Sequence, residues 1–516
     1  MPTPNNITIT YDAATRTFIC VCHHDDRAIP KDAGFFWSPI SREWQTKKIS
    51  TAARLLKYFD ETARKVIGNT SVDTINWPTL DIRIPKDQRL KRFQEDGARF
   101  ALTRNHSYLA FDMGLGKTPT AISVINTLRA DTLIICPPFL VTNWQRELKT
   151  WLINPSIDQI SNGTAAQTSK ESVIVLPDSL LDRSTIQDFI RQRNFELLII
   201  DEAHRFKSPD AKRTKALFGG ITSRIPRVIC LSGTPMPNRP IELFSVLSSL
   251  AHNAIHFMDK HTYGLKFCNA FETKHGWDYT GASNLDVLSR LIQKDFMMRR
   301  SKAEMMPELG PKEERIIPLN GSETKDTKKL NRALYLKYQG DADQMIKHRH
   351  LGDLSEYRRL NGIDKVPVAL EYIKDILDNS SESLLVFAWH REVITLLEKE
   401  LSKITSCAVI DGGTKPRARD ERIKDFQNGD LRLLIGQIST MVGHNLTKAT
   451  RCIFVESSWS PADNEQAADR AHRIGQTDTV VVDYLVISGT IDDKIVSANK
   501  LKKININKVG LGPKGA

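Results

Sequence analysis

Short apolar runs alternate with amphipathic segments in the first half of this 516-residue chain. The runs have the length and composition of strands buried on both faces of a parallel sheet. They are TLIIC at 132–136, VIVL at 173–176, LLII at 197–200 and VICL at 228–231. The segments between them have helical periodicity, as where Ala121, Ile125 and Leu128 share one face. This alternation predicts a doubly wound α/β unit.

A second series of apolar runs, again separated by helical spacers, predicts another α/β unit in tandem with the first. These runs lie at 384–387, 408–410, 431–436, 452–455 and 480–485. The segment 306–329 between the two series is rich in Pro, Gly and charge, which is typical of a connection or hinge. We therefore expect one lobe with a helical insertion over 85–310 and a second over 315–500, followed by a basic C-terminal tail at 501–516.

The first 70 residues differ in kind, because aromatic side chains surround short β-like runs there. They predict a small β-rich accessory module. Within it, Cys20, Cys22, His23 and His24 form the one tight group of metal-ligand residue types. The group lacks a second ligand pair nearby, so alternate positions on a strand are the preferred interpretation of the cysteines over a metal site.

Composition narrows the class of protein. Hydrophobic residues make up 40% of the chain, and no run approaches the roughly 18 apolar residues of a membrane helix. The first residues, MPTPNNITIT, are too polar for a signal peptide. We expect an intracellular, monomeric protein without a membrane partner. The net charge of +12 favours a polyanionic partner.

The segment FDMGLGKTPTAI at 111–122 has the context of a phosphate-binding loop, because it follows an apolar run and opens a helix. Gly114 and Gly116 allow backbone amides to approach phosphate, and Lys117 can reach the β and γ phosphates. The Thr118 hydroxyl can ligate Mg²⁺. Phe111 stands where the strict pattern has its first glycine, so an incidental Gly-rich turn is the alternative. The loop also contains Met113 and Leu115.

Two carboxylates follow the apolar run at 197–200, where ligands gather at the carboxyl edge of a parallel sheet. Asp201 can hold Mg²⁺ there, and Glu202 can orient and deprotonate an attacking water. A charged strand end is the alternative interpretation. Because the loop and the acidic pair occur in one α/β unit, they predict an ATP site.

Near the other end of the chain, QAADRAHRIGQT at 466–477 places Arg470 and Arg473 on one predicted helical face. A solvated helix face is the simplest interpretation of two such charges. An ATP site on the other lobe gives them an anionic target, since arginines stabilise the charge of phosphoryl transfer. The segment therefore predicts an arginine finger that acts only when the lobes close.

The succession of these motifs resembles the Swi/Snf-type ATPases of helicase superfamily two over roughly residues 85–500. The matching segments are FQEDG, DMGLGKT, LIICPPFLVTNWQREL, IIDEAHRFKS, LSGTPMPNRPIEL, LLVFAWHRE and QAADRAHRIGQ. WDYTGASNLDVL and MMRRSKAEMMPELGPK are most similar to the HARP branch of annealing helicases. The resemblance implies two tandem RecA-like doubly wound lobes that use ATP and Mg²⁺ and act on duplex or forked DNA.

The resemblance also implies roles for further residues. Gln94 would read adenine, and Gly443 would lie at the nucleotide. Trp144 would lie near the tracked DNA strand. Ser232, Gly233 and Thr234 would couple hydrolysis to movement.

Two departures from the family pattern stand out. Thr440 and Met441 occupy the places of a Gly-Gly pair before Gly443, which leaves nucleic-acid contacts in that loop in doubt. The long insertions of nucleosome remodellers are missing, which favours a compact bacterial or phage motor in the cytoplasm, or a nuclear protein if the source is eukaryotic. AGFFWSPISREWQT in the accessory module is similar to a HARP-type β module, with a plain aromatic core as the alternative.

The favoured interpretation is an ATP-dependent double-stranded DNA translocase that remodels or reanneals DNA in fork repair without processive unwinding. A strand-separating helicase, or the motor subunit of a restriction or defence system, is the second. A DNA-binding scaffold with a vestigial ATPase is the third. The full set of phosphate-binding, acidic and arginine residues argues against the third.

Overall fold

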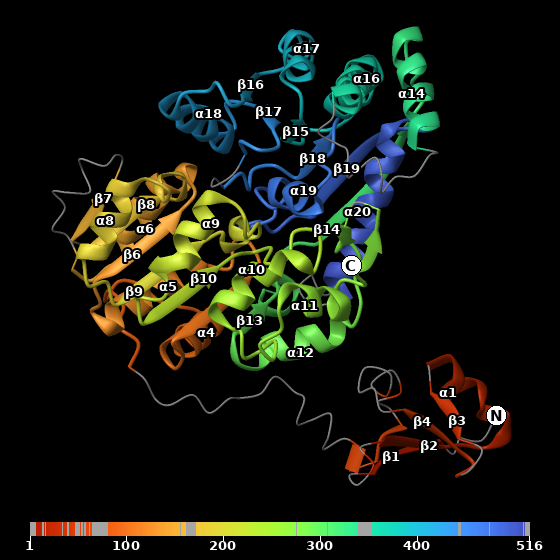
Figure 1. Cartoon of the computed structure of the whole chain (residues 1–516). Coiled ribbons are helices and arrows are strands. Elements are labelled where there is room, and N and C mark those ends of the chain that lie inside the picture. The colour runs from red at the N-terminus through yellow and green to blue at the C-terminus, as the bar shows by residue number, and fades with distance from the viewer. Residues whose placement is uncertain are drawn as a thin grey trace. The chain divides into compact units, whose positions relative to one another are not determined.

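The chain divides into two compact units, Met1–Thr79 and Leu80–Ala516. The computed structural model describes residues 7–510 with gaps. The gaps are 13–14, 16, 34, 39–40, 47–51, 53–54, 56–57, 61, 64–80, 155, 161–171, 275, 307, 339–351, 442–444, 474 and 509. Each unit is described by itself below, with the elements labelled as in Figure 1.

The first unit is built on a four-stranded antiparallel sheet in the order β1-β2-β4-β3. Its elements are β1 (Thr8–Asp12), β2 (Thr17–Val21), η1 (His24–Asp26), α1 (Ala28–Ala33), β3 (Phe36–Ser38) and β4 (Glu43–Thr46). Trp37 and Trp44 pack edge to face, with ring centroids 5.6 Å apart. Cys20 is buried within β2 and Cys22 follows the strand. The predicted β-rich module is thus confirmed.

The second unit begins with a seven-stranded sheet in which every pair is parallel, in the order β13-β5-β10-β9-β6-β8-β7. The strands are β5 (His106–Phe111), β6 (Thr132–Cys136), β7 (Ile157–Gln159), β8 (Val173–Pro177), β9 (Leu197–Asp201), β10 (Arg227–Leu231) and β13 (Met297–Arg300). The four apolar runs predicted in this lobe correspond to β6, β8, β9 and β10. Their side chains are almost entirely buried, as expected for central parallel strands.

Helices cover both faces of this first sheet (Figure 1). Alternate strand residues such as Tyr108 and Ile200 share one core with helices from the second half of the lobe. These are α8 (Ser184–Gln192), α9 (Lys212–Ala216), α10 (Ile241–Leu250), α11 (Lys260–Phe267) and α12 (Leu285–Asp295). On the opposite face, Phe111 packs edge to face with Phe93 of α4. The helices there are α4 (Arg92–Leu102), α5 (Lys117–Leu128) and α6 (Val141–Trp151). A hairpin of β11 (Phe271–Thr273) and β12 (Gly276–Asp278) follows α11.

The second lobe has a six-stranded parallel sheet in the order β14-β19-β18-β15-β17-β16. Its strands are β14 (Lys312–Leu319), β15 (Leu384–Ala388), β16 (Cys407–Ile410), β17 (Leu433–Gln437), β18 (Arg451–Phe454) and β19 (Val480–Ile487). One face packs on α16 (Gly352–Asn379) and α17 (Arg391–Leu401), and the other on α18 (Pro416–Asn428) and α19 (Pro461–Ala468). Helices α14 (Lys325–Tyr338) and α20 (Ile491–Lys508) complete the lobe. The predicted tandem of doubly wound lobes is confirmed.

Two of the segments between or after the lobes contain more regular structure than their sequences indicated. The region 306–329, expected to be a connection or hinge, contributes the edge strand β14, which pairs along its whole length with β19. The expected tail at 501–516 begins as helix, because α20 continues to Lys508. Lys502 is buried and its ammonium donates to the Trp459 carbonyl, which fixes this part of the helix to the lobe. Within the described part of the chain, every helix is too short or too polar to cross a membrane.

Candidate functional site

The loop between β5 and α5 has the backbone geometry of a phosphate-binding loop. Gly114 and Gly116 have φ angles of +83° and +74°, and Gly116 caps the N-terminus of α5. Both angles lie in the left-handed region that side chains with a Cβ disfavour. A Cβ on Gly116 would also lie 2.1 Å from Nε2 of Gln94. The two glycines are therefore required by the shape of the loop.

Lys117 is the first residue of α5, and its side chain folds back over the loop. Its Nζ donates to the Phe111 carbonyl at 3.0 Å. Desolvation lowers the pKa of Lys117, and the nearby carboxylates of Glu202, Asp201 and Asp112 oppose that effect. A half-buried ammonium beside the amides at the N-terminus of α5 is a donor set suited to phosphate.

The acidic pair stands at the carboxyl end of β9. Oδ2 of Asp201 accepts the indole N–H of Trp144 at 2.8 Å, and Oδ1 accepts the backbone N–H of Glu202 at 2.9 Å. Glu202 has a φ of +49°, which is unusual for a residue with a side chain. Such strain concentrates at functional sites. Burial, and then the charge of Glu202, raise the pKa of Asp201.

His204 and Ser232 hold the Glu202 carboxylate in place. His204 Nδ1 lies 2.8 Å from Ser232 Oγ and 3.2 Å from Glu202 Oε2. Ser232 Oγ donates to the same oxygen at 3.3 Å and accepts the Thr234 N–H at 3.1 Å. Burial opposes ionisation of Glu202, but the hydrogen bond and charge of His204, together with the charges of Lys117 and Arg470, lower its pKa. His204 was not among the predicted site residues, although it stands two residues after Glu202.

Gly233, the middle residue of the predicted coupling segment, lies against the phosphate-binding loop. A Cβ on Gly233 would lie 2.8 Å from Met113 Cγ and 3.4 Å from Lys117 Nζ. The segment 232–234 therefore contacts both the Glu202 carboxylate and the loop, and its coupling role stays a prediction.

The second lobe brings its own polar side chains to this loop. Nη2 of Arg470 lies 3.8 Å from Sδ of Met113, and a Cβ on Gly114 would lie 3.3 Å from Cγ of Arg473. Gln466 Nε2 lies 3.5 Å from Oε1 of Glu202. Residues from both lobes thus meet at one site, as predicted for the two arginines.

The expectation that these arginines share a helical face was wrong. Helix α19 ends at Ala468, and hydrogen-bonded turns carry the chain onward. Asp469 is the C-cap residue, and its carboxylate forms ion pairs with Lys302 and Lys312 at 2.8 and 3.0 Å. We call residues 469–473 the arginine turn.

The electrostatics of the site favour an anionic ligand. Burial, and then the charge of Arg473, lower the pKa of Arg470 well below its ordinary value. Burial also lowers the pKa of Arg473 to about 10. With Lys117, three cations converge on one loop, and each has lost hydration. A triphosphate fits this set, because its oxygens supply the charge and the acceptors that the cations need.

Gln94 lies beside the phosphate-binding loop. Gln94 is buried, where its amide donates to the Leu115 carbonyl at 3.0 Å and accepts the Lys91 N–H at 2.8 Å, so it braces the phosphate-binding loop. Its adenine-reading role stays a prediction. Gly443 lies outside the described residues.

Trp144 lies inside the first lobe, against the acidic pair. Its side chain is 0% exposed, and its indole N–H is engaged by Asp201. A fully buried ring offers no surface for direct contact with a DNA strand, and the expected place of this segment near the tracked strand stays a prediction. The ring supports the acidic pair.

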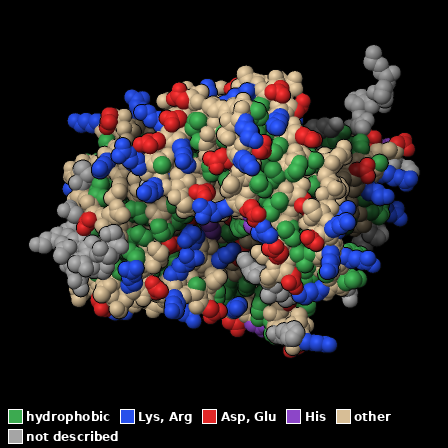
Figure 2. All heavy atoms as spheres, turned by 90° about the horizontal axis from the view of Figure 1, so that it is seen from above, with side chains coloured by type: hydrophobic (Ala, Val, Ile, Leu, Met, Phe, Trp, Pro, Cys, Tyr) green, Lys and Arg blue, Asp and Glu red, His purple; other side chains and the backbone are tan. Residues whose placement is uncertain are grey.

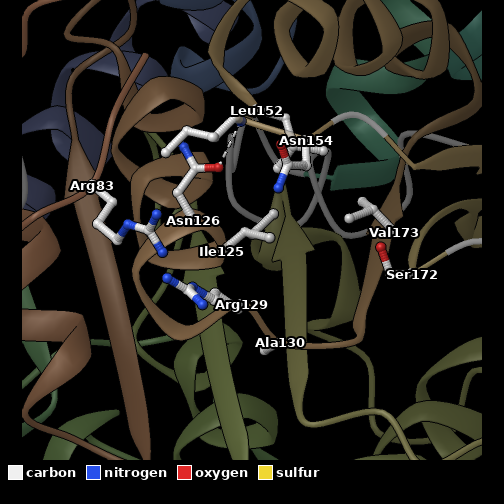
Figure 3. A pocket seen from close by; sticks show the side chains of 10 residues that line it. Arg83, Ile125, Asn126, Arg129, Ala130, Leu152, Asn154, Ser172 and Val173 are labelled. Carbon is white, nitrogen blue, oxygen red and sulfur yellow. Dashed lines mark hydrogen bonds between the residues drawn. The ribbon is translucent and has the colours of Figure 1, made fainter. Parts of the chain in front are cut away.

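A separate pocket of about 350 Å³ lies at the opposite end of α5 (Figure 3). It opens at the amino ends of β6 and β8, where Arg83 and Arg129 turn their guanidinium groups toward each other. In the wall of the pocket, the side-chain amide of Asn126 donates a hydrogen bond to the Trp151 carbonyl at 2.8 Å. Because the phosphate-binding loop is at the amino end of α5, this pocket is not part of the site described above.

Comparison with known proteins places the chain in a family. The model of the SNF2-related domain matches residues 93–364, and that of the helicase conserved C-terminal domain matches residues 368–475. The Sulfolobus solfataricus SWI2/SNF2 ATPase core in complex with dsDNA is similar at a TM-score of 0.39 and 22% identity, over 83% of this chain and 97% of that one.

Curated relatives include two animal proteins. The Xenopus laevis SWI/SNF-related matrix-associated actin-dependent regulator of chromatin subfamily A-like protein 1 is 33% identical, over 78% of this chain and 42% of its own length. The human DNA annealing helicase and endonuclease ZRANB3 is 34% identical, over 78% of this chain and 39% of its own length. The chain thus spans less than half of either relative. These matches lend no support to the expected bacterial or phage origin.

The SNF2-related match alone spans more than half of the chain, and the second match continues through the arginine turn. The boundary between the two matches falls within α16 of the second lobe, and together they span the lobe that supplies the loop and acidic pair and the lobe that supplies the arginines. The chain therefore belongs to the SNF2-related family of helicase-type ATPases.

Proposed function

We propose that this protein is an ATP-dependent translocase on double-stranded DNA that remodels or reanneals it, hydrolysing ATP between its two lobes. One observation carries the proposal. The loop, ammonium and acidic pair of the first lobe lie against Gln466, Arg470 and Arg473 of the second. A site divided between two lobes links the state of its nucleotide to the positions of those lobes.

In this proposal the triphosphate of ATP binds the amides of residues 114–117 and the ammonium of Lys117. Glu202 takes a proton from the attacking water, and its lowered pKa keeps it ionised for that purpose. His204 and Ser232 orient its carboxylate. The Asp201 carboxylate and the Thr118 hydroxyl are oxygen ligands of the kind Mg²⁺ prefers, and Mg²⁺ supplies charge neutralisation at the phosphates.

The arginine turn acts on charge that develops during hydrolysis. Arg470 and Arg473 are placed to stabilise the oxygens of the transferred phosphoryl group, and an arginine in this role accelerates hydrolysis by about 10³ to 10⁵. Gln466 contacts Glu202 from the same lobe, so it can help to orient the attacking water. A shift of the second lobe removes all three side chains together.

The proposed DNA partner rests on charge and on the relatives. The chain carries a net charge of +12, and Figure 2 shows Lys and Arg side chains gathered around a hollow in the middle of one face. One relative is by name a DNA annealing helicase. Contacts to the phosphate backbone give binding that is insensitive to sequence and sensitive to salt.

Two assays test this function. ATP hydrolysis is measured with single-stranded, duplex and forked substrates, each as DNA and as RNA, and duplex DNA is expected to stimulate most. Triplex displacement and fork unwinding are then run side by side, with Glu202→Gln protein as the control. ATP-dependent triplex displacement with poor unwinding is the expected result. Efficient unwinding without triplex displacement would favour a strand-separating helicase instead.

A further inference from the structure

The segment 301–311, which joins the two lobes, also contacts the arginine turn at two points. Lys302 Nζ donates to the His472 carbonyl at 2.6 Å and pairs with Asp469 Oδ2 at 2.8 Å. At the other end of the segment, the Gly310 carbonyl lies 2.7 Å from His472 Nε2. The segment that joins the lobes is therefore held against the arginine turn by hydrogen bonds and an ion pair.

The same segment is fixed to the phosphate-binding loop. Asp112, the residue before Met113, accepts the backbone N–H of Lys302 on Oδ2 at 2.8 Å. Its other carboxylate oxygen pairs with the guanidinium of Arg299, which also donates to the Ala110 carbonyl at 2.8 Å. Arg299 and Lys302 are both buried, so water does not compete strongly for these bonds.

Lys302 thus lies between the two halves of the site. Its backbone is bound to the carboxylate that precedes the phosphate-binding loop, and its ammonium is bound to Asp469 and His472. Asp469 directly precedes Arg470, and His472 directly precedes Arg473. Both residues that the Lys302 ammonium contacts are therefore direct neighbours of an arginine in the sequence.

We infer that Lys302 is a positioning residue, which holds the arginine turn at the distance from the phosphate-binding loop that hydrolysis requires. The inference rests on the proposed function, because it concerns the geometry of the same ATP site. Lys302 itself does not touch the nucleotide. Its loss should therefore reduce turnover while leaving the nucleotide contacts of the first lobe intact.

The chain offers a matched control in Lys312. This lysine pairs with the other oxygen of Asp469 at 3.0 Å and with Glu465 at 3.5 Å. It stands on β14, within the second lobe, so its contacts do not cross between lobes. Removing either lysine side chain leaves Asp469 with one ammonium partner. Only the removal of the Lys302 side chain disconnects the arginine turn from the segment that is bound to the phosphate-binding loop.

The experiment compares Lys302→Met and Lys312→Met in the full chain. It measures kcat, KM and the Kd of a nonhydrolysable ATP analogue, with duplex DNA present, and the melting temperature. Because a misplacement of about 1 Å can cost roughly 10²-fold in rate, Lys302→Met is expected to lower kcat by about 10- to 100-fold. Its Kd is expected to stay within about threefold of wild type, and Lys312→Met is expected to keep a kcat well above that of Lys302→Met.

A conservative variant separates positioning from packing. Lys302 lines an interlobe cavity of about 850 Å³, which leaves room for a longer side chain. Lys302→Arg keeps the charge and is expected to recover most of the kcat that Lys302→Met loses. If the methionine variant does not fold, Lys302→Gln replaces it with the same expectation, since its amide can donate but carries no charge toward Asp469.

The possible failures are distinct. A wild-type protein that does not hydrolyse ATP would overturn the proposed function and this inference together. Active wild type with an unchanged kcat in Lys302→Met would overturn the inference alone. Equal losses of kcat in the two methionine variants, or a loss of nucleotide affinity as large as the loss of kcat, would assign Lys302 a structural role.

Discussion

The indole N–H of Trp144 donates to Oδ2 of Asp201 at 2.8 Å, from α6 to the carboxyl end of β9. The other oxygen of Asp201 accepts the Glu202 N–H at 2.9 Å, so both carboxylate oxygens have a donor from the first lobe. These two bonds fix the plane of the carboxylate. The remaining lone pairs are then oriented for the Mg²⁺ that the proposed reaction requires.

Trp144→Phe should move the acid limb of the pH profile. Burial and the charge of Glu202 raise the pKa of Asp201, whereas the Trp144 bond lowers it, so loss of the bond raises the pKa further. Because Asp201 binds Mg²⁺ only when ionised, activity falls as the pH drops through this pKa. The limb of kcat/KM is expected at about one pH unit higher than in wild type. Trp151→Phe, on the same helix, is the control, and an acid limb that coincides with wild type would contradict the role of Trp144.

Glu202→Gln should abolish DNA-stimulated hydrolysis, because an amide cannot accept the proton of the attacking water. Turnover is expected to fall by about 10² to 10⁴. Nucleotide and DNA binding are expected to persist, since the residue handles water. Filter binding and steady-state hydrolysis on one preparation check both. Normal turnover in this variant would remove Glu202 from the proposed mechanism.

Arg473→Ala should lower single-turnover hydrolysis by as much as about 10³ to 10⁵, with a much smaller change in nucleotide affinity. The reason is that the arginine acts on charge present mainly in the transition state. Binding and the chemical step are measured separately. An equal loss in both would mean that Arg473 is a ground-state ligand or a structural residue.

Gly116→Ala should weaken ATP binding roughly tenfold, because a left-handed alanine costs about 1–2 kcal/mol and its Cβ displaces Gln94 from the loop. Gly219→Ala is the matched control. Gly219 is exposed, and a Cβ there meets no atom within 4 Å. Titration with a fluorescent nucleotide compares the two, and equal affinities would show that the loop tolerates a side chain at this position.

The strands that could be predicted from the sequence are those buried on both faces. β6, β8, β9 and β10 contain apolar runs because the side chains of those runs are buried on both faces of the sheet. β14 could not be found this way, since its sequence KEERIIPL lies at a sheet edge with mostly exposed side chains. Its strand conformation depends on pairing with β19, which is distant in sequence.

The residues of the candidate site also differ in whether the sequence could predict them. Residues whose role follows from a local pattern, such as Lys117 and Glu202, could be assigned from the sequence. Gln466 and Lys302 could not, because their roles depend on a partner in the other lobe. The end of α19 at Ala468 was missed as well, because the residues after it keep a helical spacing in the sequence although the chain continues there in turns.

The contact between segment 301–311 and the arginine turn also affects how far different parts of the second lobe move when that lobe rotates. In a rigid rotation of the second lobe about this segment, each atom moves in proportion to its distance from the axis. The arginines lie beside the axis, whereas β16 is at the far edge of the sheet from β14, five strand spacings or roughly 24 Å away. A retreat of the arginines small enough to stop hydrolysis therefore accompanies a much longer stroke at the β16 edge.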